Sequence, residues 1–231
     1  MLKKKNFIIY ILIIFTVATA VVYFCFPKGK NYTVIKELEK IKQENSEMSV
    51  YVDNVINELN RFEESEKEFE KYLALGLAWK GLADRTMDNN HYQQALNIYE
   101  SAIDSSERKN MIALMNAGNM SVYLGDYQKA EKYYNECVNL APGDVVPYLK
   151  LMELYRYKMK KNSDEIVQML DRGIKKMFYP LILILRKASY LKEIGQYEEA
   201  LKVYNDLVSD DPESEAKYGG QIREIEDMLT K

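Results

Sequence analysis

Four segments of the chain resemble one another at a nearly constant spacing. Three share a tyrosine followed three residues later by an alanine, at Tyr92 and Ala95, Tyr127 and Ala130, and Tyr197 and Ala200. In the remaining segment Ser163 and Ile166 stand at these positions. The steps between segments are about 34 to 36 residues, the length of a helix-turn-helix repeat. Such a period predicts stacked helix pairs, because one pair cannot bury its apolar stripe alone.

The scarcity of turn-forming residues agrees with a helical chain. Of 231 residues only 5 are proline and 10 are glycine, which argues against a many-turned sheet protein. Gly125 and Gly195 are expected to end first helices in a left-handed conformation. Pro142 and Pro212 are expected to stop second helices. The expected fold class of the repeat region is all-α.

The repeated segments resemble the tetratricopeptide repeat family, whose pattern is W-x2-L-G-x2-Y, then G-x-Y-x2-A-x3-F-x2-A, then P. The fullest matches are 125–130 (GDYQKA) followed by Tyr134 and Pro142, and 195–200 (GQYEEA) followed by Tyr204 and Pro212. The resemblance covers residues 76–212. It implies an α-solenoid of four repeats, 76–109, 111–144, 145–180 and 181–212, to which residues 213–231 would add a capping helix.

In this family the first helix of each repeat lines a concave groove that receives a peptide or a partner helix. Carried over repeat by repeat, the resemblance places these side chains in the groove: Lys80, Asp84, Met87, Met115, Asn119, Tyr123, Glu153, Arg156, Tyr157, Ser189 and Lys192. The stacking positions do not explain Tyr123 and Tyr157, so these two are expected to contribute most to binding. The implied partner is a protein or peptide.

A carboxylate clamp, with which some family members hold the C-terminus of heat-shock chaperones, is not expected. Lys80 and Asn116 match two clamp positions and Lys150 partly matches a third. Asp84 and Val146 break the pattern, and an aspartate repels a carboxylate.

Residues 7–26 form an uncharged apolar run, FIIYILIIFTVATAVVYFCF. A helix of this length rises roughly 30 Å, the thickness of the hydrocarbon core of a bilayer. The run therefore predicts a single-pass transmembrane helix. A cleaved signal peptide is the rival, because residues 18–20 (ATA) have the form of a cleavage site. The run continues to Phe26, which favours an uncleaved anchor.

The lysines around this run predict its orientation. Residues 3–5 are three lysines, whereas Lys28 and Lys30 follow the run. The positive-inside rule then makes residues 1–6 a cytoplasmic tail and places the repeat domain outside the cytoplasmic membrane. Lys36, Lys40 and Lys42 also follow the run, so they reduce the difference in positive charge between its two sides.

Residues 27–75 are expected to form a helical juxtamembrane segment. Apolar side chains lie alternately four and three residues apart in a seam, with Asn45 and Glu66 as polar interruptions: Val34, Leu38, Ile41, Met48, Val52, Val55, Leu59, Phe62, Phe69 and Leu73. One interpretation is a stalk that pairs with a second copy. The other, which we favour, is helices that pack on the first repeat, with breaks near Asn45 and at Ser65, since any amphipathic core helix shows such a seam.

The sequence contains no recognisable catalytic or cofactor site. No cluster has metal-ligand spacing, no glycine-rich phosphate loop follows a strand, and His91 is expected in a solvated turn. Cys25 and Cys137 cannot easily meet in a disulfide. The net charge of -3 and the lack of a basic run argue against nucleic acid. We expect no enzymatic activity and no cofactor.

The sequence as a whole predicts a membrane-anchored scaffold or adaptor that binds a protein in its groove on the extracytoplasmic side. Two alternatives remain. The first is a self-associating stalk or spacer in an envelope complex. The second is an accessory subunit that faces the cytoplasm.

Overall fold

A computed structural model describes residues 31–64 and 68–230 of the chain. Within these two ranges there are eleven α-helices, α2 to α12, and no strand. The predicted cytoplasmic tail (1–6), membrane helix (7–26) and cleavage site lie outside the described residues. Among the described residues, no helix is both long enough and apolar enough to cross a membrane.

The two N-terminal helices that the structure describes, α2 and α3, pack as an antiparallel pair. α2 (Asn31–Glu44) turns through the short 3-10 helix η1 (Ser46–Met48) into α3 (Ser49–Glu64). At the turn the Asn45 side chain accepts a hydrogen bond of 3.0 Å from the Glu47 backbone N–H. Leu38, Val55 and Leu59 of the apolar seam are buried in one core with residues of α4 (Glu68–Thr86). The seam is therefore covered within the chain, and a second copy is not needed to cover it.

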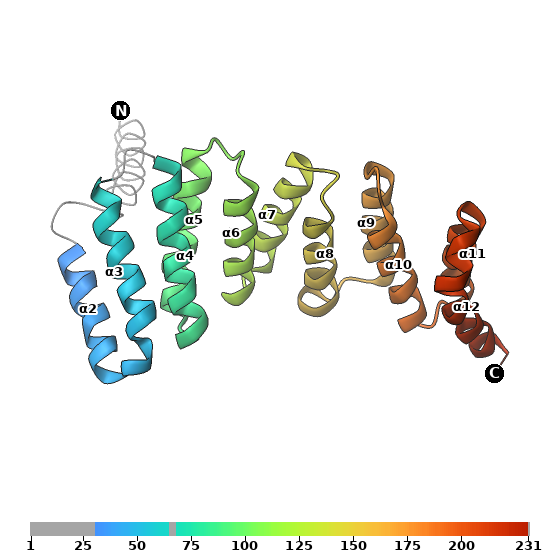
Figure 1. Ribbon diagram of the computed structural model, residues 1–231, viewed down its shortest axis with the longest axis horizontal. Coiled ribbons are helices and arrows are strands. Elements are labelled where there is room, and N and C mark those ends of the chain that lie inside the picture. The colour runs from blue at the N-terminus through green and yellow to red at the C-terminus, as the bar shows by residue number, and fades with distance from the viewer. Residues whose placement is uncertain (1–30, 65–67, 231) are drawn as a thin grey trace, which may run out of the picture.

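Four helix pairs follow in chain order and stand side by side as an elongated array (Figure 1). They are α4 with α5 (Asn89–Ser105), α6 (Met111–Tyr123) with α7 (Tyr127–Leu140), α8 (Val145–Glu153) with α9 (Ser163–Lys176), and α10 (Leu181–Glu193) with α11 (Tyr197–Asp210). α4 begins at Glu68, before the predicted repeat boundary at residue 76. The reason is that Phe69 and Leu73 pack on the core that α3 helps to form, so the helix gains burial by starting earlier.

The array ends with the 3-10 helix η3 (Pro212–Ser214) and α12 (Glu215–Leu229). Tyr218 and Ile225 of α12 are buried against Ala200 and Tyr204 of α11. α12 thus covers the apolar face that the last helix pair would otherwise expose.

Short polar side chains set where the helices begin. The Asn110 and Asp126 side chains accept from backbone N–H groups of the first turns of α6 and α7, and Asn162 and Glu165 form a reciprocal capping box at α9. These contacts satisfy donors that have no partner inside the helix. Gly125 and Gly195 have φ of 80° and 79°, so the predicted left-handed ends of the first helices are confirmed.

His91 is not in a solvated turn as expected. The connection after α4 is so short that α5 begins at Asn89, which places His91 in its first turn. The imidazole is half-buried, its ring centroid 5.8 Å from that of Trp79, and Nδ1 is hydrogen-bonded to the Thr86 hydroxyl at 2.8 Å. Burial lowers the pKa of His91, although Asp88 acts in the opposite direction.

Candidate functional site

The side chains predicted to line the groove come from every first helix of the array. Lys80 and Asp84 lie on α4 with Met87 just after it; Met115, Asn119 and Tyr123 lie on α6; Glu153 ends α8, Arg156 and Tyr157 follow it, and Ser189 and Lys192 lie on α10. None of these is buried. Met87, Tyr123 and Tyr157 are 70%, 51% and 54% exposed, so the largest apolar members of the set face solvent. That they bind a partner stays a prediction.

Two of the predicted groove residues also support the fold. The Tyr134 hydroxyl donates a hydrogen bond of 2.8 Å to Asn119 Oδ1. Met115 is partly buried and packs against two apolar clusters of the core, one that extends from α2 to α7 and one that extends from α7 to α10. Their substitution would therefore affect stability as well as any contact with a partner.

An aromatic contact joins the first and second repeats. The rings of Tyr92 in α5 and Tyr123 in α6 are stacked, with centroids 4.6 Å apart and planes 13° from parallel. The Tyr92 hydroxyl donates to Met87 Sδ at 3.5 Å. Because Tyr92 is buried, it holds the exposed Tyr123 in one orientation. A side chain already held in place loses little entropy when a partner contacts it.

The third repeat departs from regular helical geometry at the predicted groove. After Glu153 the chain continues as a π-helix, η2 (Leu154–Met159), which ends at Lys160 with a left-handed φ of 53°. The Lys161 N–H donates to the Tyr155 carbonyl at 3.0 Å. Arg156 and Tyr157 belong to this segment. Isolated π-turns recur at functional sites, and no sequence pattern had indicated one here.

Arg156 is held between two rings and a carboxylate. Its guanidinium carbon lies 4.8 Å from the ring centroid of Tyr157 and 5.4 Å from that of Tyr190. It also forms an ion pair with Glu193 of α10. The hydrogen bond that Arg156 donates to Glu193 raises the pKa of Arg156, and burial opposes the shift. The contribution of the buried Tyr190, on the next first helix, was missed by sequence reasoning.

Several charged side chains of the first helices form ion pairs with neighbours. Lys80 pairs with Asp84, Lys150 with Glu153 and Lys192 of α10 with Glu224 of α12. Exposed pairs of this kind add little stability, about 0–1 kcal/mol each. Their effect on recognition is larger, because an incoming carboxylate would have to displace Asp84 from Lys80. This arrangement gives no support to a carboxylate clamp and favours aromatic and apolar contacts.

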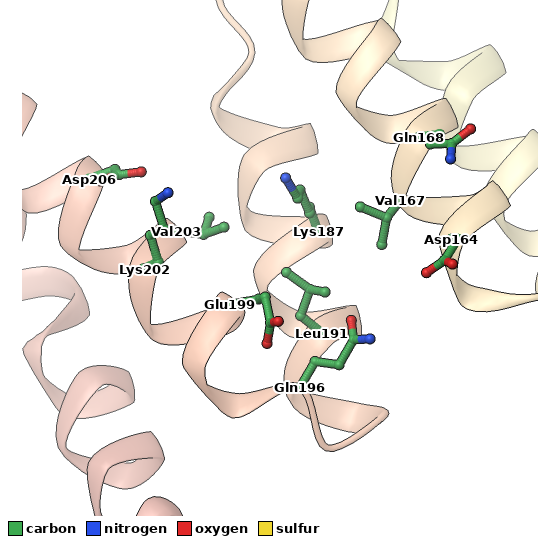
Figure 2. Close-up of a pocket in the computed structure, with 10 residues that line it drawn as sticks. All are labelled: Asp164, Val167, Gln168, Lys187, Leu191, Gln196, Glu199, Lys202, Val203 and Asp206. Carbon is green, nitrogen blue, oxygen red and sulfur yellow. The ribbon is translucent and has the colours of Figure 1, made fainter.

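A separate surface cleft of about 570 Å³ lies among α9, α10 and α11. Figure 2 shows its lining, in which charged and amide side chains surround a few apolar ones: Asp164, Val167, Gln168, Lys187, Leu191, Gln196, Glu199, Lys202, Val203 and Asp206. No predicted groove residue lines it. Lys187 is paired with Asp171 at 2.7 Å.

Neither a metal-binding cluster nor an exposed thiol is found among the described residues. In ranges 31–64 and 68–230, no three His, Cys, Asp or Glu side chains gather to hold a metal ion. Cys137 is a buried free thiol. Burial raises its pKa to about 12, and since the thiolate is the reactive form, this cysteine is inert at neutral pH.

Two models of the tetratricopeptide repeat family match the chain, over residues 80–145 and 184–214. No curated protein sequence matches it. The matched residues take in the first, second and fourth helix pairs and omit most of the third, which contains the π-helix. The matches support the tetratricopeptide repeat family, whose repeats build scaffolds for protein–protein interaction, and so support protein partners in general.

Proposed function

We propose that this tetratricopeptide-repeat protein is a membrane-anchored scaffold that binds a protein or peptide along its first helices. The observation that carries the proposal is the exposure of Met87, Tyr123 and Tyr157, which lie on or directly after the first helices of three successive repeats. Tyr123 is stacked on the buried Tyr92, and Tyr157 lies against the guanidinium of Arg156. Rigid, exposed aromatic side chains are typical anchors of protein interfaces.

The partner surface that fits these residues is apolar or aromatic. Lys80, Arg156 and Lys192 already have carboxylate partners, so a strongly acidic ligand gains little from them. Met87 and the two tyrosines offer polarisable, amphipathic surface instead. An extended peptide or an amphipathic helix with aromatic or aliphatic side chains would complement them.

The anchoring part of the proposal rests on the apolar run at 7–26. Its length suits a bilayer-spanning helix, and the lysines at 3–5 favour a cytoplasmic N-terminus with the repeats outside. Of the alternatives, the self-associating stalk is less supported, because the seam of α2 and α3 is covered by α4. A cytoplasm-facing accessory subunit differs only in orientation.

Crosslinking in intact cells tests the binding surface. A photoreactive amino acid replaces Tyr123 in the full chain, and a matched control carries it at Gln128, an exposed position of α7. We expect a crosslinked partner from position 123 and a much lower yield from position 128. Equal yields from the two positions would remove the first helices as the binding surface.

A triple variant provides the second arm. With the photoreactive group at Met87, we combine Tyr123→Ser, Arg156→Gln and Tyr157→Ser, and expect the same crosslinked partner to be lost. If its yield stays unchanged, the groove residues do not hold the partner. Circular dichroism of the variant verifies that the helices are retained.

Two further measurements test the anchor and its orientation. Carbonate-washed membranes are expected to retain the full chain, and deletion of residues 1–26 to release it. A reporter that is active only outside the cytoplasm, fused after Lys231, is expected to be active. Activity of a cytoplasmic reporter at the same site would instead support the accessory-subunit alternative.

A further inference from the structure

Exposed apolar side chains collect at one edge of the array, the connecting edge, where α5, α7 and α9 end and α6, α8 and α10 begin. Figure 1 shows these three connections along its upper side. The side chains concerned are Ile112, Val146, Phe178, Tyr179, Leu181 and Ile182. Phe178 and Tyr179 are 87% and 84% exposed. Nothing in the packing of the repeats calls for apolar side chains there.

The connection between α9 and α10 combines aromatic rings with positive charge. Phe178 and Tyr179 contact edge to face, with ring centroids 4.9 Å apart. Lys175 and Lys176 are exposed in the last turn of α9. Within the described ranges neither lysine forms an ion pair, whereas Arg108 and Lys109 at the α5–α6 connection are paired with Glu136 and Glu107. Aromatic rings beside free lysines are typical of a segment at a membrane interface.

The same edge lies next to the predicted anchor. Because neighbouring helices run antiparallel, α2 begins where α3 ends and α4 begins, on the connecting edge. Only residues 27–30 separate α2 from the apolar run that ends at Phe26. Four residues span at most roughly 14 Å even when fully extended. If the run crosses a bilayer, the beginning of α2 is therefore held close to the bilayer surface.

We propose that the connecting edge lies against the bilayer that holds the anchor, with Phe178 and Tyr179 in the interface and Lys175 and Lys176 near anionic headgroups. This inference rests on the proposed membrane anchoring. Met87, Tyr123 and Tyr157 lie near the opposite ends of their helices. Docking of the edge therefore leaves the proposed partner surface free and orients it away from the lipid.

Tryptophan quenching by brominated lipid tests the contact. Trp79 is the only tryptophan, so the full chain carries Trp79→Phe together with Phe178→Trp. The matched control carries Tyr157→Trp at the opposite edge. Both are reconstituted in vesicles of phosphatidylcholine and phosphatidylglycerol with brominated acyl chains. We expect roughly twofold or greater quenching of the indole at position 178 and little at position 157.

The lysines provide a further variant. Lys175→Glu with Lys176→Glu should weaken the quenching at position 178, because the change replaces two charges that attract anionic headgroups with two that are repelled by them. If Trp79→Phe prevents folding, a nitroxide on Phe178→Cys in a Cys25→Ser background replaces the indole, since the buried Cys137 does not label. The ratio of its accessibility to oxygen to its accessibility to a nickel chelate should then exceed the ratio for a nitroxide on Tyr157→Cys.

The outcomes separate this inference from the anchoring. A full chain that does not float with the vesicles overturns both. A chain that floats but shows no more quenching at position 178 than at position 157 keeps the anchor and overturns the docked edge. Position 178 could also be shielded from water without being quenched, and two chains could crosslink through it. That result would show that a second copy covers the connecting edge, and it would also overturn the inference.

Discussion

Single glycines decide how closely the paired helices approach. A Cβ atom added at Gly118 of α6 would lie 2.4 Å from Cε1 of Tyr134, and one added at Gly76 of α4 would lie 2.8 Å from Cε1 of Tyr99. Both tyrosine rings are almost fully buried. In each repeat the tyrosine ring of the second helix fills the space beside the glycine of the first helix. This close packing stabilises the helix pair.

Gly118→Ala is therefore expected to destabilise the protein by about 1–3 kcal/mol, because the buried ring of Tyr134 has to move. The control is Gly143→Ala in the α7–α8 connection, where an added Cβ meets nothing within 4 Å. Chemical denaturation of both variants provides the measurement. Equal stability of the two would show that the close approach at Gly118 is unimportant.

Burial of His91 predicts a pH dependence of stability. Its pKa in the folded protein lies below the ordinary value of 6.5. The unfolded chain therefore binds the proton more readily, and stability falls as the pH drops below about 6.5. Between about pH 7.5 and about pH 5.5 the wild type should lose more unfolding free energy than His91→Gln. An identical loss in both would contradict this role for the imidazole.

At the scale of elements, the period of the apolar residues predicted most of the helices. It could not show which neighbouring element packs on the apolar face of each helix. The seam through Leu38, Val55 and Leu59 suits a coiled coil as well as a core helix. In the structure the seam packs against α4, a contact that the sequence pattern cannot show. Likewise, the sequence indicated Asn45 only as a polar interruption of the seam. In the structure its side chain caps η1 at the turn between α2 and α3.

The π-helix lacked a sequence signal for a physical reason. Its backbone pattern depends on how Tyr155 and its neighbours pack between α7 and α9, and not on residue type alone. As a result the placement of Arg156 and Tyr157 could be predicted only to the level of the helix. The cation–π contacts of Arg156 with Tyr157 and Tyr190 follow from that local geometry.

Lys160, which ends the π-helix, tests this geometry. Its φ of 53° and ψ of 40° are unfavourable for a residue with a Cβ atom. Lys160→Gly should therefore stabilise the protein by about 0.5–1 kcal/mol. Lys158→Gly, also exposed but inside the π-helix, should destabilise it by a similar amount. Thermal unfolding of the pair checks the sign, and destabilisation by both would argue against the left-handed end.

At the scale of the whole molecule, the core is a series of three apolar clusters. The first extends from α2 to α7, the second from α7 to α10, and the third joins α10, α11 and α12. The third cluster contains the fewest buried side chains. Since each repeat contacts mainly its neighbours, stability is expected to vary along the array and not to be uniform.

Hydrogen exchange should reveal this gradient. Amides of α11 and α12 are expected to exchange at least about tenfold faster than those of α4, α5 and α6, because less apolar surface must be exposed to open them. Lys192→Ala removes the ion pair with Glu224 and should accelerate exchange in α12 more than in α5. Uniform protection along the chain would mean that the array unfolds as one unit.

The candidate surface was predictable in outline only. The repeat pattern placed its residues on first helices, where the structure finds them accessible. It could not reveal that Asn119 is hydrogen-bonded to Tyr134 or that Arg156 pairs with Glu193, since these contacts join residues by tertiary packing. Phe178 and Tyr179 were visible in the sequence, but their exposure depends on the connection that carries them.

Oxidative footprinting of the full chain tests most directly whether the first helices hold a partner. Labelling of Met87, Tyr123 and Tyr157 is compared between native membranes and the purified chain in lipid vesicles, with Tyr127 of α7 as the reference. The account predicts that these three side chains are protected in native membranes and become reactive in the purified chain, while Tyr127 changes little. Equal labelling of all three in both samples would contradict it.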